Sequence, residues 1–175
     1  CVGDNGRVYV VGSVEGTVGT EPRVGGVDMC LACYDANGSN QWTRVFGTSD
    51  QPDRACGVAC ATNGDVLVVG HTWGNMGGAT NQGQYDFVIA CFTPAGSNRW
   101  TRSWGSDNAD RAYAVALDPA GDIYVAGDAR GTIDAESPVG GRDVCLTRLT
   151  ADGQRIWTSM WGSSLDDTAY GVALG

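Results

Sequence analysis

The chain has 175 residues, of which 42% are hydrophobic and 18% charged, so it can bury a core and is too apolar for a disordered segment. Its net charge is −9, which argues against nucleic acid as a partner. All 11 basic residues are arginines, and the lack of lysine excludes Schiff-base chemistry and a Walker-type phosphate loop. A single histidine, His71, excludes a histidine-rich metal site within one chain, and no apolar run reaches the ~20 residues of a membrane span.

Short apolar runs separated by glycine-containing turns predict strands along the whole chain. The first is "RVYVVG" at 7–12, and the next is "DMCLACYD" at 28–35. β-Branched and aromatic residues fill such runs, and no segment has a 3.6-residue apolar stripe of helical length. The sequence therefore predicts a nearly all-β protein.

Three copies of one unit make up the sequence. The phrases "GSNQWTRVFG", "GSNRWTRSWG" and "GQRIWTSMWG" recur with their first tryptophans 58 and then 57 residues apart. In the same register, several glycines and aspartates match in all three copies. The third copy is predicted to form four strands, at 113–117, 123–128, 143–150 and 155–162.

Four antiparallel strands in a repeat of about 57 residues indicate β-propeller blades, so the fold class predicted is all-β with three tandem blades. The predicted boundaries are 1–55 for a first blade without its inner strand, 56–112 and 113–169 for two complete blades, and 170–175 for an inner strand that completes another blade. The small side chains of "YAVAL" suit the innermost strand, and the tryptophan strand is expected to be outermost.

The motifs "AVALDPAGDIYVAG", "DFVIACFTPAG" and "RWTRSWG" resemble the bacterial beta-propeller repeat family, often called SBBP repeats. The resemblance extends over essentially all of the chain and its three copies. It implies a propeller fold and a secreted or cell-surface protein of bacteria, but no particular activity. The chain departs from the family pattern in its longer period and in the cysteines within its strands.

Repeated aspartates are the first candidate binding residues. Asp53, Asp110 and Asp167 precede the first strand of a blade in "PDRA", "ADRA" and "DDTA". One interpretation makes them calcium ligands or a ring of carboxylates at the channel mouth. The other, which recurrence in every copy favours, makes them acceptors of backbone N–H groups in the loops between blades. No metal-ligand spacing is present, and Ca²⁺ is the cation that the first interpretation would require.

The long loops are the second candidate. Segments 14–27, 72–85 and 129–142 differ most between copies and should lie on one face, opposite the tight turns, where a ligand is expected to bind. Four acidic residues in these loops make a cationic or metal-bridged partner plausible: Glu15, Glu21, Asp134 and Glu136. His71, at the end of a predicted strand, has no evident nucleophile partner and is interpreted as a polar surface residue.

Seven cysteines are interpreted mainly as small core residues. Cys30 and Cys33 lie three apart on a predicted strand and so point to opposite faces, which argues against a shared metal or disulfide. Cys56 and Cys60 share a face but lie ~13 Å apart along their strand. Pairing between different strands remains open.

These features favour a non-catalytic extracellular or cell-surface scaffold, used for binding a protein or glycan or for assembly into a ring or filament. The alternative is a secreted propeller enzyme, glycan-active or quinoprotein-like, with its site at the long-loop face. Three blades are too few to close on themselves, so further copies of the blade are the expected partners, either in a longer polypeptide or in another chain.

Overall fold

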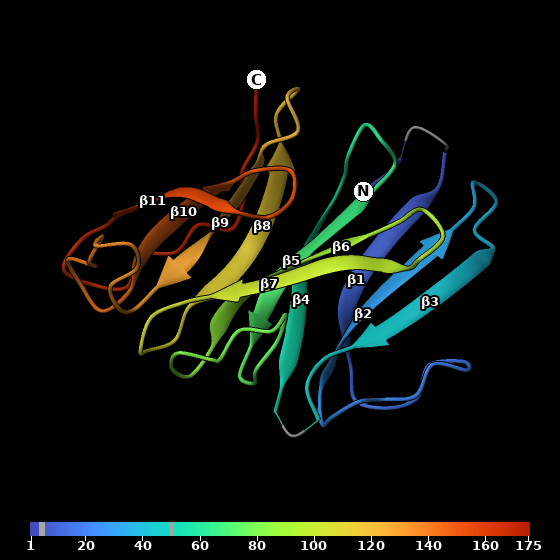
Figure 1. Ribbon diagram of the computed structural model, residues 1–175, viewed down its shortest axis with the longest axis horizontal. Helices are drawn as coiled ribbons and strands as arrows, with labels where there is room; N and C mark the ends of the chain where they lie inside the picture. Colours follow the sequence, from blue (N-terminus) through green and yellow to red (C-terminus); the bar gives the residue numbers. More distant parts are fainter. Residues whose placement is uncertain (4–5, 50) are drawn as a thin grey trace.

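Residues 1–3, 6–49 and 51–175 are described by a computed structural model, in which three antiparallel sheets follow one another along the chain (Figure 1). The prediction of an all-β protein is confirmed, since the described residues form eleven strands and no helix. Sheet 1 contains β1 (Val8–Val14), β2 (Asp28–Tyr34) and β3 (Asn40–Phe46). Sheet 2 contains β4 (Asp53–Cys60), β5 (Val66–Thr72), β6 (Asp86–Phe92) and β7 (Asn98–Trp104). Sheet 3 contains β8 (Arg111–Leu117), β9 (Ile123–Ala129), β10 (Asp143–Leu149) and β11 (Arg155–Trp161).

Each sheet is a simple up-and-down meander in chain order. The strands of the third copy agree with the sequence-based boundaries to within two residues. The first strands of sheets 2 and 3 begin at Asp53 and Arg111, somewhat before the expected boundaries at 56 and 113. Among the described residues no helix is long and apolar enough to cross a membrane.

Sheet 1 has three strands, and residues 1–3 lie where the first strand of the other sheets lies. The amino group of Cys1 donates to the Tyr9 carbonyl (3.0 Å), and the Tyr9 amide donates back (2.9 Å). The corresponding pairs in the other sheets are Ala59–Leu67 and Ala116–Tyr124. The pairing of Cys1 is therefore the one that the repeat alignment predicts.

The core lies between the sheets, as expected where both faces of a sheet are covered. One buried cluster between sheets 1 and 2 includes Tyr9, Leu31 and Val68, and a second, between sheets 2 and 3, includes Ile89 and Val125. The first strands pack against one another across these layers, β4 against β1 and β8 against β4 and β5. Side chains as small as alanine and glycine let these strands approach.

Tight turns and long loops lie at opposite ends of the strands, as the meander requires. In Figure 1 the turn at 118–122 points upward, whereas the loop at 15–27 lies at the bottom. Residues 4 and 5 of the predicted turn at 4–6, and residue 50 of the loop at 48–55, lie outside the described residues.

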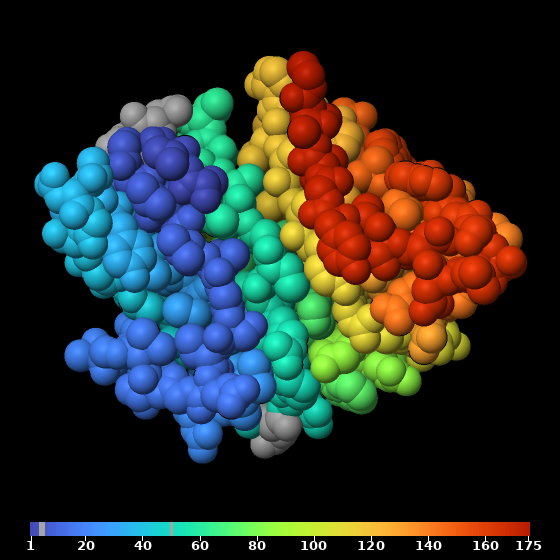
Figure 2. All heavy atoms as spheres, turned by 180° about the vertical axis from the view of Figure 1, so that it is seen from behind, coloured from blue at the N-terminus to red at the C-terminus, as the bar shows by residue number. Residues whose placement is uncertain are grey.

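The C-terminal segment 170–175 forms no strand, and it follows sheet 3 along the side of β8 (red beside yellow in Figure 2). The Tyr170 ring lies 5.2 Å from the Tyr113 ring on β8, and the Ala169 amide donates to the Gly127 carbonyl. The predicted pairing of this segment in another blade involves a further copy and stays a prediction.

The cysteines divide into three groups. Cys1 and Cys60 form a disulfide with their Cα atoms 6.4 Å apart, so for these two the interpretation as simple core residues is wrong. The bond joins residues 1–3 to the end of β4, because the first strands of adjacent sheets approach closely there. Cys33, Cys91 and Cys145 are buried free thiols and Cys30 is half-buried, as core residues should be, whereas Cys56 is exposed.

Candidate functional site

Two β-bulges shape the end of the first strands nearest the long loops. The pairing of β4 with β5 skips a residue between Ala55 and Gly57, and that of β8 with β9 skips one between Ala112 and Ala114. The extra residues, Cys56 and Tyr113, occupy the same position of the repeat. A bulge bends its strand and re-aims the side chain that it inserts. We therefore take the surroundings of Cys56 and Tyr113 as the candidate functional site.

Cys56 meets the single histidine at this site. Its Sγ lies 3.9 Å from Nδ1 of His71, which comes from the neighbouring strand β5. His71 is only 5% exposed, and the Tyr85 ring lies edge-on to it with centroids 4.9 Å apart. The Tyr113 ring centroid lies 6.3 Å from that of His71.

This arrangement breaks the symmetry of the repeat. The position of His71 is occupied by Ser13 in the first copy and by Asp128 in the third, and the position of Cys56 is a tyrosine in the third. A residue that only builds the sheet would be expected in every copy. The Cys56–His71 pair is thus specific to sheet 2.

Electrostatics keep this pair uncharged near neutral pH. Burial, and secondarily the positive charges of Arg111 and Arg54, lower the pKa of His71 to about 4. Burial raises the pKa of the Cys56 thiol, against a smaller opposing effect of Arg54. Reactive cysteines instead have a lowered pKa and a thiolate at neutral pH. The geometry therefore provides a neutral thiol facing a neutral imidazole, rather than an activated nucleophile.

Charged groups border the site on sheet 3. Asp128 is fully buried and accepts a hydrogen bond from Thr168 Oγ1 (3.1 Å), and its oxygens lie 4.0 Å from guanidinium nitrogens of Arg111 and Arg142. Burial raises the pKa of Asp128, and burial together with Asp128 raises that of Tyr113. The Arg111 guanidinium also lies over the Tyr85 ring, 5.2 Å from its centroid.

The repeated aspartates predicted as candidate ligands lie where the loops between sheets end: Asp53 is the first residue of β4, Asp110 directly precedes β8, and Asp167 follows β11. Asp53 and Asp110 are fully buried, whereas Asp167 is partly exposed. Each accepts hydrogen bonds from the backbone amide and the hydroxyl of a Thr or Ser in the preceding loop: Thr48, Ser106 and Ser163 respectively. These are the contacts of side chains that hold a loop in place.

A second aspartate of each copy lies beside the first. Asp28 accepts from the amides of Val24 and Gly25, and Asp86 accepts from that of Gln82. In the described part of the chain no group of three or more His, Cys, Asp or Glu side chains is placed to hold a metal ion. The structure therefore gives no geometry for a calcium site at these pairs.

The four acidic residues of the long loops do not converge on one point. Glu21 forms an ion pair with Arg44 on β3 (3.3 Å), and Asp134 forms one with Arg155 on β11 (3.2 Å). Glu15 and Glu136 are exposed on the loops of sheets 1 and 3. The ion pairs fold these loops back onto the outermost strands of two different sheets.

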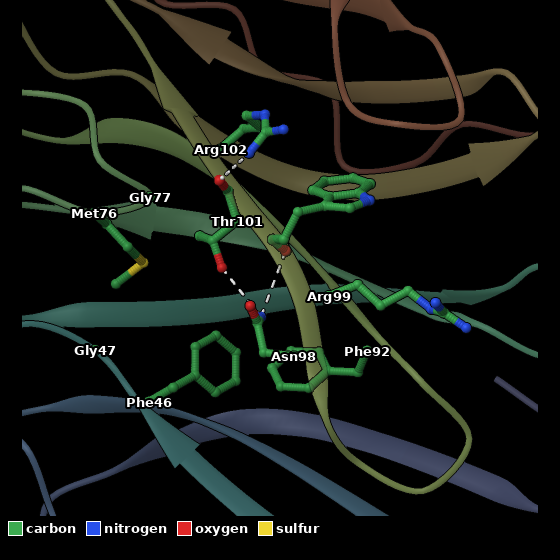
Figure 3. Close-up of a pocket in the computed structure, with 10 residues that line it drawn as sticks. Phe46, Gly47, Met76, Gly77, Phe92, Asn98, Arg99, Thr101 and Arg102 are labelled. Atoms are coloured by element: carbon green, nitrogen blue, oxygen red, sulfur yellow. Dashed lines mark hydrogen bonds between the residues drawn. The ribbon is translucent and has the colours of Figure 1, made fainter.

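A groove of about 570 Å³ runs along β7 between sheets 1 and 2 (Figure 3). Phe46 and Met76 approach it from one side, and Asn98 beside it hydrogen-bonds Thr101 Oγ1 (3.1 Å). A second groove of about 560 Å³ lies along β3, with Trp42 where the first has Trp100. Because the groove recurs at equivalent positions, we regard it as a product of the repeat.

Sequence reasoning missed the Cys56–His71 pair. The interpretation of His71 as a polar surface residue without a nucleophile partner is wrong, because the side chain is buried beside a thiol. The alignment of Cys56 with Tyr113 was the available signal, but the bulge that turns both side chains is visible only in the strand register.

No family model matches the chain. It is 26% identical over 194 aligned residues to regulatory protein FlaEY of Caulobacter vibrioides, a match that covers 98% of this chain and 20% of that protein. The chain thus spans about a fifth of the length of this relative.

Proposed function

We propose that the chain is a non-catalytic scaffold of β-propeller blades, related to the bacterial beta-propeller repeats, whose outer sheets pack against further copies of the same sheet. Such copies would belong to the same polypeptide or to a second chain. The supporting observation is a difference in burial between equivalent residues.

Each sheet has one face turned toward the preceding sheet, and one valine of its second strand lies on that face. The exposure of this valine depends on whether a preceding sheet covers it. Val68 and Val125 are 0% and 1% exposed, because sheets 1 and 2 cover them, whereas Val10 of sheet 1 is 50% exposed. On the opposite face Trp104 is 6% exposed beneath sheet 3, and the equivalent Trp161 of sheet 3 is 52% exposed. The uncovered positions are those that a preceding and a following sheet would bury.

Glycines support the same order. A Cβ on Gly96 or Gly153 would lie 3.0 or 2.8 Å from the ring of Trp42 or Trp100 on the preceding sheet. Gly38, the equivalent in sheet 1, has no atom within 4 Å of such a Cβ in the described structure. The turns of sheets 2 and 3 thus pack on the tryptophan of the preceding sheet, whereas the turn of sheet 1 at Gly38 has no such contact in the described structure.

The proposal also includes a cellular location and a binding face. The Cys1–Cys60 disulfide favours an oxidising compartment, which suits an extracellular or cell-surface protein. A protein or glycan partner would bind at the long-loop end. The relative's description as a regulatory protein is compatible with a binding role. The enzyme alternative has less support, because the raised thiol pKa of Cys56 disfavours a nucleophile there.

The proposal is tested by the association of the 175-residue chain, which carries both uncovered faces. Sedimentation velocity over a range of concentrations should show association that Val10→Asp or Trp161→Asp each abolishes, with unchanged circular dichroism. A head-to-tail contact is heterologous, so an equimolar mixture of the two variants has one intact interface and should form dimers but nothing larger.

Two results would contradict the proposal. A wild-type chain that stays monomeric at all concentrations would show that the faces do not recognise one another. A mixture of variants that stays monomeric, although wild type associates, would show a different interface.

A further inference from the structure

The Cys56–His71 pair lies on two adjacent strands of sheet 2, β4 and β5, and brings a soft sulfur next to an imidazole nitrogen. Cys56 is exposed as a whole residue, although its thiol is partly desolvated beside His71. His71 is almost completely buried, with Nδ1 toward Sγ. With Nδ1 as the acceptor, the neutral imidazole carries its proton on Nε2. Thiolate sulfur selects Cu(I) and Zn(II) among transition metals, and an imidazole nitrogen suits copper and zinc as well.

The distance between the donors fits a shared metal ion. Metal–sulfur and metal–nitrogen bonds of about 2.3 and 2.05 Å, as for zinc, allow a sulfur–nitrogen separation of up to about 4.4 Å. The observed 3.9 Å corresponds to a sulfur–metal–nitrogen angle of roughly 127° with these bond lengths. The separation between the two atoms is therefore compatible with one ion bound to both.

Charge and ligand number decide which ion fits. No group of three metal-ligating side chains exists among the described residues, whereas zinc in proteins takes three or four protein ligands. Arg54 and Arg111 place positive charge near the pair, with Asp128 and Tyr113 on the facing strands of sheet 3. A monovalent ion bound to a thiolate gives a centre with no net charge, whereas a divalent ion gives a centre with one positive charge. The nearby arginines repel the positively charged centre more.

We propose that Cys56 and His71 bind one Cu(I) ion, with Sγ and Nδ1 as its two protein ligands. Binding replaces the Cys56 S–H bond by a sulfur–copper bond and releases one proton to solvent, and copper remains Cu(I) throughout. His71 releases no proton. Affinity should therefore increase about tenfold per pH unit below the thiol pKa.

The test is an anaerobic titration of the whole chain with Cu(I) in competition with bicinchoninate. Wild type should retain one ion per chain, and Cys56→Ser or His71→Gln should each weaken binding more than ~100-fold. Cys30→Ser is the matched control, because Cys30 is also a free thiol that is not fully buried but has no histidine beside it. The Cys30→Ser variant should bind Cu(I) as wild type does.

A second measurement needs no variant. One equivalent of Cu(I) should protect Cys56 of wild type, and no other thiol, from alkylation by iodoacetamide. Peptide mass spectrometry measures this protection, which tests copper binding even if His71→Gln does not fold. Retention of Cu(I) by Cys56→Ser, or equal loss in Cys30→Ser, would overturn the proposal. Tight binding of Zn(II), or a thiolate-to-cobalt charge-transfer band with Co(II), would overturn the assignment to a monovalent ion.

Discussion

At the scale of single residues, a glycine separates two carboxyl groups in every copy. A Cβ on Gly47 would lie 2.6 Å from oxygens of both Asp28 and Asp53, and one on Gly105 would collide with Asp86 and Asp110. Burial, and to a smaller extent the charge of Asp28, raises the pKa of Asp53. Burial, and to a smaller extent the charge of Asp110, raises the pKa of Asp86 to about 6. The recurrent glycine therefore makes room for an acidic pair that shapes the loops.

We predict that Gly105→Ala destabilises the chain by about 1–3 kcal/mol, because the methyl group must displace two buried and hydrogen-bonded aspartates. Urea denaturation followed by tryptophan fluorescence measures the loss. Gly26→Ala is the control, since nothing lies within 4 Å of the place that its methyl group would take, and it should change stability little. Equal effects of the two substitutions would refute the steric argument.

His71 makes stability depend on pH. Its pKa is lowered from 6.5 to about 4 in the folded chain, so the neutral form is favoured by folding. The stability that it contributes is complete above pH 6.5 and is lost as the pH falls towards 4. Asp86, whose pKa is raised, acts in the opposite sense over much of the same range, since its contribution is present at low pH and is lost as the pH rises through about 6.

The contribution of His71 can be isolated by subtraction. Between about pH 7 and pH 4 the free energy of unfolding of wild type, minus that of His71→Gln, should fall by roughly 3 kcal/mol. Asp86 is present in both proteins and cancels. A difference that is constant across this range would show that the imidazole is not held neutral.

At the scale of elements, the turns between the third and fourth strands join neighbouring sheets. Trp42 Nε1 donates to the Pro94 carbonyl (3.2 Å), and Arg44 Nε donates to that of Gly96 (2.9 Å). The tryptophan strands of sheets 1 and 2 thus each receive the turn of the next sheet.

The equivalent turns allow a matched comparison. Gly38 and Gly153 have positive φ angles of 80° and 81°, so alanine imposes the same backbone strain on both. Of these two glycines, Gly153 faces a tryptophan ring of the preceding sheet and Gly38 does not. Gly153→Ala should therefore destabilise the chain by about 1–2 kcal/mol more than Gly38→Ala in urea denaturation of the monomer. Equal losses would show that the turn does not seat tightly on Trp100.

At the scale of the whole molecule, the Cys1–Cys60 disulfide joins two residues 59 apart in sequence and so links sheets 1 and 2. The chain-entropy model assigns about 4 kcal/mol to a loop of this size. The β-sheet core between the sheets does not depend on this bond, because it is built from buried aliphatic and aromatic side chains.

Reduction should accordingly lower the urea midpoint without unfolding the chain at room temperature, and a chelator should leave the circular dichroism spectrum unchanged. Cys1→Ser/Cys60→Ser should match the reduced protein. Loss of the β-sheet spectrum on mild reduction would mean that the core alone is insufficient, and loss on chelation would indicate a structural metal.

The sequence by itself determined the three copies, the positions of the strands and turns, and the smaller number of strands in the first sheet. These follow from local patterns, since alternating apolar runs and glycine turns act within a few residues. The register in which Cys1 pairs with Tyr9 was also implicit in the alignment. Whether the three sheets belong to a propeller remains a proposal.

Only the tertiary structure decided which side chains meet. Cys56 reaches His71 because a bulge turns it, and Cys60 reaches Cys1 because two first strands approach across a layer. The aspartate pairs form because a loop returns to the start of an earlier strand beside a glycine. Such contacts join residues far apart in the chain, so they depend on packing and register, which the local periodicity of a sequence does not encode.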